Sequence, residues 1–174
     1  QGESKWTKGI TGQTERLATL TKELVALARM DEGGAQLVTE EFSISETVTE
    51  ILDAFSLMAE QKGLTFTSDI MPDISFKGDK SMIAKLCSIM ADNAVKYTPD
   101  GGHISFRLTK KGKRITLSSE NTAEDVTKGA HPELFDRFRR GDSSHSSDTP
   151  GYGIGLSMAQ SIASAHGGRI EAFS

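Results

Sequence analysis

Apolar residues in the first thirty positions follow a heptad stripe. Five of them fall at alternating heptad positions: Ile10, Leu17, Leu20, Leu24 and Leu27. A single amphipathic helix of about 20 residues is only marginally stable alone, so this helix is expected to pair with another one. Gly33 and Gly34 follow it and are expected to end it. We therefore place a domain boundary after residue 34.

A second helical stripe follows a capping signal. Ser43 and Glu46 have the spacing of a capping box. The apolar positions after them recur with the helical period: Ile44, Val48, Ile51, Phe55 and Met58. Gly63 is the expected end of this helix. Short strands are then expected around Phe66 and Phe76.

The rest of the chain alternates between helical and strand patterns. Asp79 is expected to cap a helix that runs to about Tyr97, with Leu86, Met90 and Asn93 on the same face as Tyr97. The alternating residues of 103–109 and 114–120 predict a hairpin. A short helix over 132–138, a loop over 141–153, a helix from about Leu156 to Ala163 and a strand over 169–173 complete the pattern. This order predicts an α/β (α+β) two-layer sandwich, with one layer of helices on a mixed sheet.

Composition narrows the classes of function. The 174 residues carry a formal net charge of −4, which excludes a broadly basic nucleic-acid binder but permits a local basic site. The single cysteine, Cys87, excludes an internal disulfide framework and a cysteine-based zinc cluster. No apolar run approaches the roughly 20 residues of a membrane span. The first residue is Gln1 and the last residues begin a strand, so we expect a piece of a longer protein.

Three short motifs carry candidate chemistry. In the stretch from Asp92 to Pro99, Asn93 and Lys96 lie one helical turn apart. An amide oxygen suits Mg²⁺, an ammonium group suits phosphate, and the neighbouring Tyr97 offers an aromatic surface. The plainer interpretation is the polar end of a surface helix.

The second motif is a glycine loop, and the third is an aromatic and basic stretch. Gly151, Gly153 and Gly155 alternate directly before Leu156, at the opening of a helix whose N-terminus favours negative charge. Phe135 and Phe138 precede two arginines that suit phosphate: Arg139 and Arg140. The plainer interpretations are a flexible hinge and a packed helix with a solvated basic end.

Read in order, Asn-Ala-x-Lys-Tyr-Thr-Pro, Phe-x-Arg-Phe and Gly-x-Gly-x-Gly-Leu resemble the N, F and G2 boxes of sensor histidine kinases. The catalytic domain of that family has the Bergerat ATP-binding fold. The resemblance covers about residues 40–174, and residues 13–31 resemble the second helix of the kinase dimerisation domain. It implies an incomplete dimerisation hairpin in residues 1–34 and a catalytic domain in residues 35–174, whose last strand would lie beyond Ser174.

The resemblance also implies residue roles, with ATP and Mg²⁺ as cofactors. Asn93 would bind Mg²⁺, Lys96 would meet phosphate, and Tyr97 would stack near adenine. Arg139 or Arg140 would face the γ-phosphate, and the glycine loop that ends at Leu156 would form the hinge and phosphate cradle.

Three features depart from the family pattern and change these expectations: the adenine box, the residue one turn before Asn93, and the phosphoacceptor. Asn121 stands where the family's adenine box has Asp, which predicts ATP binding weaker by roughly 1–2 kcal/mol. The same box has Ala123 and Asp125 where the family has glycines. Ile89 replaces the glutamate with which hydrolytic relatives activate water, which argues against a dedicated ATPase.

The third departure is the phosphoacceptor. None of the four histidines has the family's acceptor pattern on a dimerisation helix: His103, His131, His145 and His166. We expect solvated or structural roles for them and an acceptor upstream of Gln1, so that this piece does not phosphorylate itself.

These expectations define one leading hypothesis and two rivals. The leading one is the Mg-ATP-binding catalytic domain of a two-component sensor histidine kinase, cytoplasmic within a membrane protein. Its expected partners are a response regulator receiver domain and a second copy of the chain, with no nucleic acid. One rival is a catalytically weak or inactive nucleotide-binding and dimerisation module. The other is an anti-sigma-type serine kinase, against which the heptad helix argues.

Overall fold

The computed structural model describes residues 37–124, 126–137 and 153–174, together with nine helical residues between 11 and 28. The elements, in chain order, are β1 (Glu40–Ser43), α2 (Ile44–Gln61), β2 (Thr65–Ile70), β3 (Ser75–Gly78), α3 (Lys80–Tyr97), β4 (His103–Lys111), β5 (Arg114–Asn121), the 3₁₀ helix η1 (Pro132–Phe135) and α4 (Gly155–Ala165). The domain boundary after residue 34 stays a prediction, since it falls outside the described residues.

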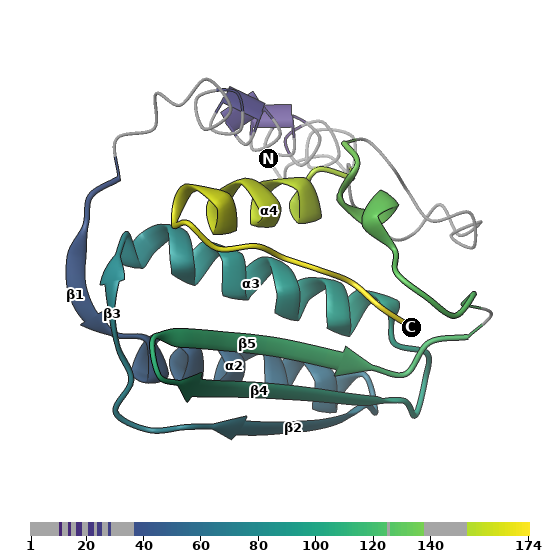
Figure 1. Cartoon of the computed structure of the whole chain (residues 1–174). Helices are drawn as coiled ribbons and strands as arrows, with labels where there is room; N and C mark the ends of the chain where they lie inside the picture. The colour runs from purple at the N-terminus through teal and green to yellow at the C-terminus, as the bar shows by residue number, and fades with distance from the viewer. Residues whose placement is uncertain are drawn as a thin grey trace, which may run out of the picture.

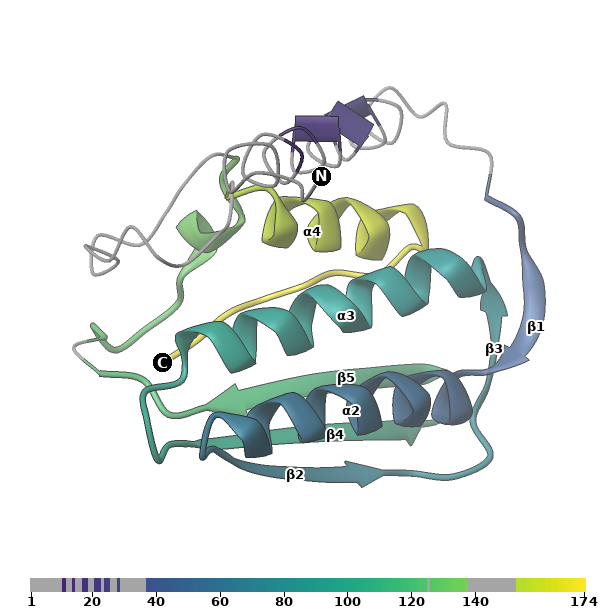
Figure 2. The same cartoon turned by 180° about the vertical axis from the view of Figure 1, so that it is seen from behind.

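The main sheet is mixed, as predicted. Strand β2 pairs with β4 in parallel, and β4 pairs with β5 in the antiparallel hairpin. Strands β1 and β3 form a separate antiparallel pair. In Figures 1 and 2, α2 and α3 lie side by side on one face of the main sheet, and α4 lies along α3. The predicted sandwich of helices on a mixed sheet is confirmed.

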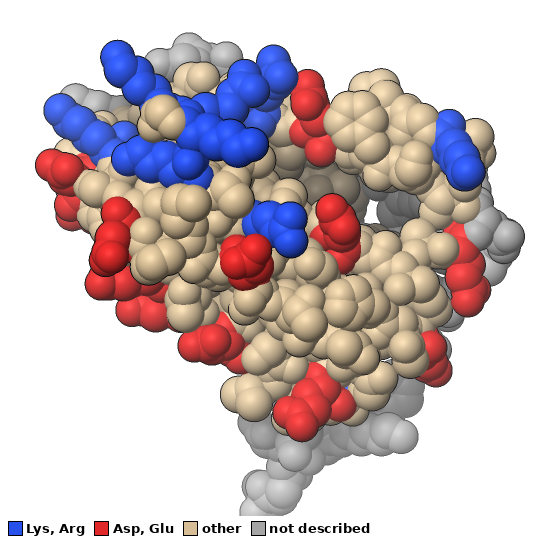
Figure 3. Space-filling view, turned by 60° about the horizontal axis from the view of Figure 1, so that its bottom comes forward, with Lys and Arg blue, Asp and Glu red and all other residues tan. Residues whose placement is uncertain are grey.

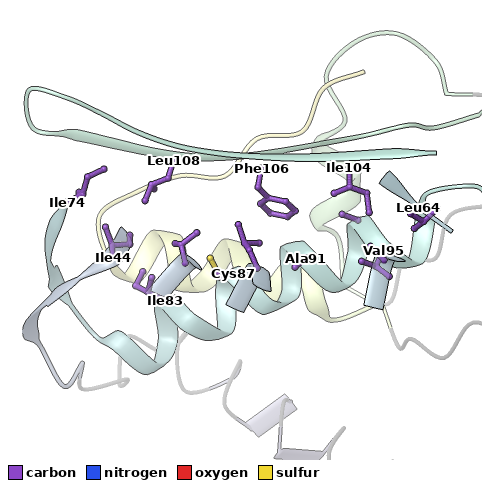
Figure 4. Packing of buried hydrophobic residues seen from close by; sticks show 14 residues of the cluster. Ile44, Leu64, Ile74, Ile83, Cys87, Ala91, Val95, Ile104, Phe106 and Leu108 are labelled. Carbon is purple, nitrogen blue, oxygen red and sulfur yellow. The ribbon is translucent and has the colours of Figure 1, made fainter. Parts of the chain in front are cut away.

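The core lies between the sheet and the helices. Ile104, Phe106 and Leu108 alternate along β4 and are fully buried. Figure 4 shows them directed at α3, where Cys87 and Ala91 face back toward the sheet. A second buried cluster joins α3 to α4: Ile89, Ile154, Met158, Ala159 and Ile162. This second cluster fixes α4 on α3, and Leu24 of the N-terminal helix packs against it.

Local capping signals explain where two of the helices begin. The Ser43 hydroxyl accepts from the Glu46 N–H at 3.2 Å, and Asp79 Oδ1 accepts from the Met82 N–H at 3.1 Å. Gly63, with φ +70°, follows the last turn of α2. The predicted start of α2, its glycine stop and the cap of α3 are therefore confirmed.

Other predictions need correction. The expected strand over 169–173 is wrong, because these residues make only an isolated bridge between Phe173 and Ala130. Their neighbour is an irregular segment in which Gly129 has φ +134°, so no ladder extends from the bridge. The helix expected from Pro132 is a single 3₁₀ turn, and β1 was not predicted at all. Among the described helices, none is long and apolar enough to cross a membrane.

Candidate functional site

Asn93 lies in the last turns of α3 with its side chain half-buried. Its amide nitrogen donates to the Ile89 carbonyl oxygen at 2.8 Å, one turn back along the helix. That bond fixes the rotation of the amide group, so the oxygen atom points away from the α3 backbone. Among the described residues the amide oxygen has no hydrogen-bond partner. An oriented acceptor is therefore available at this position.

The start of α4 lies directly over Asn93. A Cβ atom built on Gly155, the first residue of α4, would stand 3.5 Å from Ile89 Cγ2 and 3.8 Å from Asn93 Nδ2. The second core cluster holds this approach, since it contains both Ile89 and Ile154. The fold therefore brings Gly155 of the glycine loop and the polar end of α3 together, although 62 positions separate Asn93 from Gly155.

The beginning of α4 differs from that of the other two helices. Its N-cap residue is Ile154, which makes no side-chain cap. Like α3, it has no acidic residue in its first turn. The first backbone N–H groups of a helix have no intrahelical partners, and they carry the positive end of the helix dipole. Gly153, with φ +68°, leads into this turn. The N–H groups of the first turn and the Asn93 oxygen can therefore bind an anion and its counterion together.

Lys96 is one turn further along α3. Its ammonium group contacts the Asp92 carboxylate at 2.5 Å in an (i, i+4) pair. The pair holds the lysine close to the helix surface near Asn93. An ammonium group has three donors, so one bond to Asp92 leaves two for another acceptor. The predicted phosphate contact of Lys96 stays a prediction.

Tyr97 ends α3 and is 53% exposed, so its ring is accessible. The chain then turns through the buried Thr98, whose hydroxyl donates to the Ala94 carbonyl oxygen. Gly102 has no room for a side chain there, because a Cβ atom would lie 2.5 Å from Thr98 Cγ2 and 3.3 Å from Thr122 Cβ. This close contact brings the end of β5 against the end of α3.

Asn121 is the last residue of β5 and is exposed. Its amide nitrogen donates to the Thr122 carbonyl oxygen at 3.0 Å, which leaves its oxygen as an acceptor beside the same end of α3. We name the region around Asn93, Tyr97, Asn121 and Gly155 the open end of the molecule. The contacts among Thr98, Gly102 and Thr122 bring these residues together, and they join positions that are distant in the sequence.

Not every predicted site residue can be placed. Arg139, Arg140 and Gly151 lie outside the described residues, as does Asp125. Leu156 is half-buried against the cluster that joins α4 to α3. Its side chain therefore anchors the helix, and its predicted place beside a ligand stays a prediction.

The remaining reactive side chains of the described residues make structural contacts. His103 contacts the Thr67 hydroxyl, His131 lies 2.9 Å from Glu133, and His166 bonds to backbone groups. The hydrogen bond to Glu133 raises the pKa of His131. Burial raises the pKa of the Cys87 thiol to about 12, so this cysteine is not a thiolate nucleophile at neutral pH. His145 lies outside the described residues.

Charge is distributed unevenly over the surface. Figure 3 shows Lys and Arg side chains gathered at one corner of a face whose other charges are mostly acidic. Four exposed basic residues lie at the β4–β5 turn: Lys110, Lys111, Lys113 and Arg114. This turn is the far end of the hairpin from Asn121, which pairs with Ile104. The basic turn is therefore separate from the open end.

Known proteins resemble this chain both in sequence and in fold. Residues 78–174, more than half of the chain, match the family described as "Histidine kinase-, DNA gyrase B-, and HSP90-like ATPase". The probable sensor protein PcoS of Escherichia coli is 31% identical over 160 residues, which cover 92% of this chain and 34% of PcoS. The chain thus spans about a third of that relative.

Solved structures share the fold. Full-length ShkA in complex with AMPPNP gives a TM-score of 0.76 at 21% identity, covering 95% of this chain and 34% of ShkA. The histidine kinase ThkA in complex with the response regulator protein TrrA gives 0.67 at 19% identity, covering 97% of this chain and 46% of that one.

Proposed function

Because the chain belongs to the family of histidine kinase-, DNA gyrase B- and HSP90-like ATPases, we propose that its open end binds ATP and that the intact protein is a sensor histidine kinase. The observation that carries the proposal is the placement of the uncapped start of α4 over the Asn93 amide. Free N–H groups at a helix N-terminus suit the phosphates of a nucleotide. The exposed Tyr97 ring and the Asn121 oxygen lie at the same end and suit the adenine base.

Magnesium fits this donor set. Mg²⁺ in nucleotide sites commonly takes one or two protein oxygens, and phosphates and waters complete its octahedron. The amide oxygen of Asn93, which has no partner among the residues that the structure describes, is such a ligand. The described residues contain no group of three or more His, Cys, Asp or Glu placed to hold a metal, so protein ligands beyond Asn93 would be few. When bound, the ion neutralises charge on the phosphates.

The proposed reaction is transfer of the γ-phosphoryl group to a histidine nitrogen. The nitrogen forms a bond to phosphorus as the bond to the β–γ bridging oxygen breaks, and ADP leaves. The residues of this chain would supply position and charge: the start of α4 and Lys96 hold phosphate, and Arg139 or Arg140 would face the γ-phosphate. Ile89, beside Asn93, has no group that can take a proton from water, so hydrolysis is disfavoured.

The contacts of the histidines bear on which residue accepts the phosphoryl group. His103, His131 and His166 are all engaged in hydrogen bonds, so we assign the acceptor to a histidine outside them, on a dimerisation hairpin completed by a second copy. The next acceptor would be a response regulator receiver domain, the kind of partner bound by ThkA. We expect this catalytic domain to lie in the cytoplasm, within a membrane sensor.

Titration with Mg-ATP tests the site. We expect millimolar Mg-ATP to raise the melting temperature of the wild type, and Asn93→Ala to weaken binding by about tenfold, which corresponds to about 1.4 kcal/mol. Lys111→Ala, at the basic turn, is the matched control and should bind as the wild type does. Absence of a shift in the wild type with both ATP and ADP would refute the nucleotide site.

A second candidate function is a nucleotide-binding module without phosphotransfer. The observation that favours it is Asn121, an uncharged side chain where the family pattern has a carboxylate. A longer protein that carries the dimerisation hairpin separates the two. Acid-labile phosphate on that protein after incubation with γ-labelled ATP supports the kinase, whereas binding without labelling supports the module.

A further inference from the structure

His166 directly follows α4 and uses both nitrogens of its ring. Nε2 lies 3.0 Å from the backbone nitrogen of Asp79, and Nδ1 lies 2.8 Å from the Ile162 carbonyl oxygen. A backbone N–H only donates and a carbonyl oxygen only accepts, so Nε2 is the acceptor and Nδ1 carries the hydrogen. The two bonds therefore require the tautomer that carries its hydrogen on Nδ1.

The residues around the His166 ring leave room for it. A Cβ atom on Gly78 would lie 2.7 Å from His166 Cδ2 and 2.5 Å from Phe76 Cε1, so any side chain at position 78 would displace a ring. The Phe76 and His166 ring centroids are 5.9 Å apart. Gly167, with φ +69°, then turns the chain away from the helix. The residues around the end of α4 thus fix the position of the His166 ring.

Asp79 is the other half of the contact, and it holds two further segments. Its Oδ1 caps α3 and accepts from Ser81, while its Oδ2 accepts from the Val38 N–H at 3.1 Å. Burial would raise the pKa of this carboxyl group, but the bonds from Ser81, Met82 and Val38 outweigh it, and the pKa lies below its ordinary value. Segments at residues 38, 79 and 166 therefore meet at one residue. We name this meeting point the closed end.

The open end and the closed end are opposite ends of the same helix pair. Helix α4 has 11 residues, or about 16 Å at 1.5 Å per residue, with His166 after its last turn and Gly155 at its start. A helix of this length moves as a rigid body, so a displacement at His166 also moves the N–H groups that lie over Asn93.

We infer that His166 is a positioning residue for the nucleotide site: its bond to the Asp79 N–H sets where α4 lies on α3, and it links α4 to the segment that enters the domain at Val38. The inference rests on the proposed function, because it assigns a role toward the nucleotide. The rival explanation is that the ring only fills space against Phe76 and Gly78.

Two substitutions separate positioning from packing. In His166→Gln, the amide oxygen can accept from the Asp79 N–H, but the ring is lost. In His166→Phe, the ring is kept, but the acceptor is lost. We expect Gln to bind Mg-ATP within about twofold of the wild type and Phe to bind roughly tenfold more weakly. The reverse order, or two variants that both bind like the wild type, would overturn the inference.

Hydrogen exchange of backbone amides measures the bonds at the closed end without any nucleotide. We expect the amides of Val38 and Asp79 to exchange faster in His166→Phe than in His166→Gln. Val48→Ala on α2 is the control, because it removes two buried methyl groups from the core cluster that contains no residue of α4. It should lower stability without weakening binding, and any faster exchange of the two amides should match the loss of global stability. If His166→Phe does not fold, Gly78→Ala displaces the ring while keeping its acceptor, and it should raise the same exchange and weaken binding.

These measurements distinguish the two hypotheses. If the wild type does not bind Mg-ATP, the proposed function fails, and with it the role of His166 toward the nucleotide. The exchange rates would still decide whether His166 holds Val38 and Asp79. If the wild type binds but neither affinity nor exchange changes in His166→Phe and Gly78→Ala, the positioning role fails and the nucleotide site stands.

Discussion

Helices α3 and α4 run antiparallel, and their two shared ends differ in how their polar groups are satisfied. At the closed end, the Asp79 carboxylate and the His166 ring accept the N–H groups that face them, and Gly78, directly before Asp79, leaves room for the ring. At the open end, α4 begins without a side-chain cap, and the Asn93 oxygen has no partner among the described residues. Helix ends are normally capped, so an uncapped end packed against an oriented amide indicates a ligand.

The comparison predicts that the two ends respond to mutation in opposite ways. A change at the closed end should lower the free energy of unfolding, because it removes internal bonds. A change at the open end should alter nucleotide affinity and leave stability nearly unchanged, since its partners are not part of the protein.

The largest effect is expected for Asp79→Ala. The variant loses the cap of α3 and the acceptor of the Val38 N–H, so the free energy of unfolding should fall by about 2 kcal/mol. Urea unfolding with an unchanged slope measures this loss. Asp79→Ser keeps a capping oxygen for Met82 and should lose about half as much. Equal losses in the two variants would contradict the separate role assigned to the bond with Val38.

The next effect is expected at the open end, for Gly155→Asp. A carboxylate in the first turn of α4 interacts favourably with the helix dipole, so stability should hold or rise by about 0.5 kcal/mol. The same charge repels phosphate, and Mg-ATP affinity should fall by about tenfold or more. Gly155→Asn has a similar shape without the charge and is the control for calorimetric titration. If Gly155→Asp and Gly155→Asn bind Mg-ATP equally, the phosphates do not lie near the start of α4.

How well each end could be predicted depends on how local its signals are. Ser43 and Asp79 act on residues three positions away, so the starts of α2 and α3 were correctly predicted. Asn93 and the glycine loop were singled out because their residue types are unusual at that spacing. Their arrangement in space was not derivable from the spacing, since Ile89, Ile154 and Gly155 meet only through tertiary packing.

The incorrect predictions and the missed contacts have one physical origin, which is that each depends on a partner far away in the sequence. Strand β1 has four residues and is defined by pairing with β3, more than thirty positions away. The alternation over 169–173 resembles a strand, but no ladder forms where the neighbour is irregular. His166 was expected to have a solvated or structural role, but its structural partner could not be identified, because Asp79 lies 87 positions earlier. A periodic pattern reports which face is apolar and does not identify the partner of a polar atom.

A smaller effect is expected for Asn121→Asp, which restores a charged acceptor at the end of β5. A charge-assisted hydrogen bond is stronger than a neutral one, so Mg-ATP affinity should rise by about fivefold, or about 1 kcal/mol. Asn121→Ala should weaken binding by a similar factor. Titrations of the two variants together test whether Asn121 contacts the base. If neither variant changes affinity, it does not.

The smallest effect concerns pH and His131, which lies outside both helix ends. Its ring contacts Glu133, the Thr127 carbonyl oxygen and Ser174. The hydrogen bond to Glu133 raises the pKa of His131 above the ordinary 6.5. A raised pKa in the folded state means that the protonated ring stabilises the fold. This contribution is complete below the ordinary pKa and disappears as pH rises through the raised value.

Thermal unfolding of the wild type and His131→Gln from about pH 5 to pH 9 measures this contribution, since general pH effects cancel in the difference. The wild type should exceed the variant most at the acidic end, and the two should converge at the alkaline end. A constant difference would mean that His131 acts only through its neutral form. Nucleotide affinity should not follow this titration if the 127–131 segment is independent of the open end. If nucleotide affinity does follow this titration, the 127–131 segment is coupled to the open end.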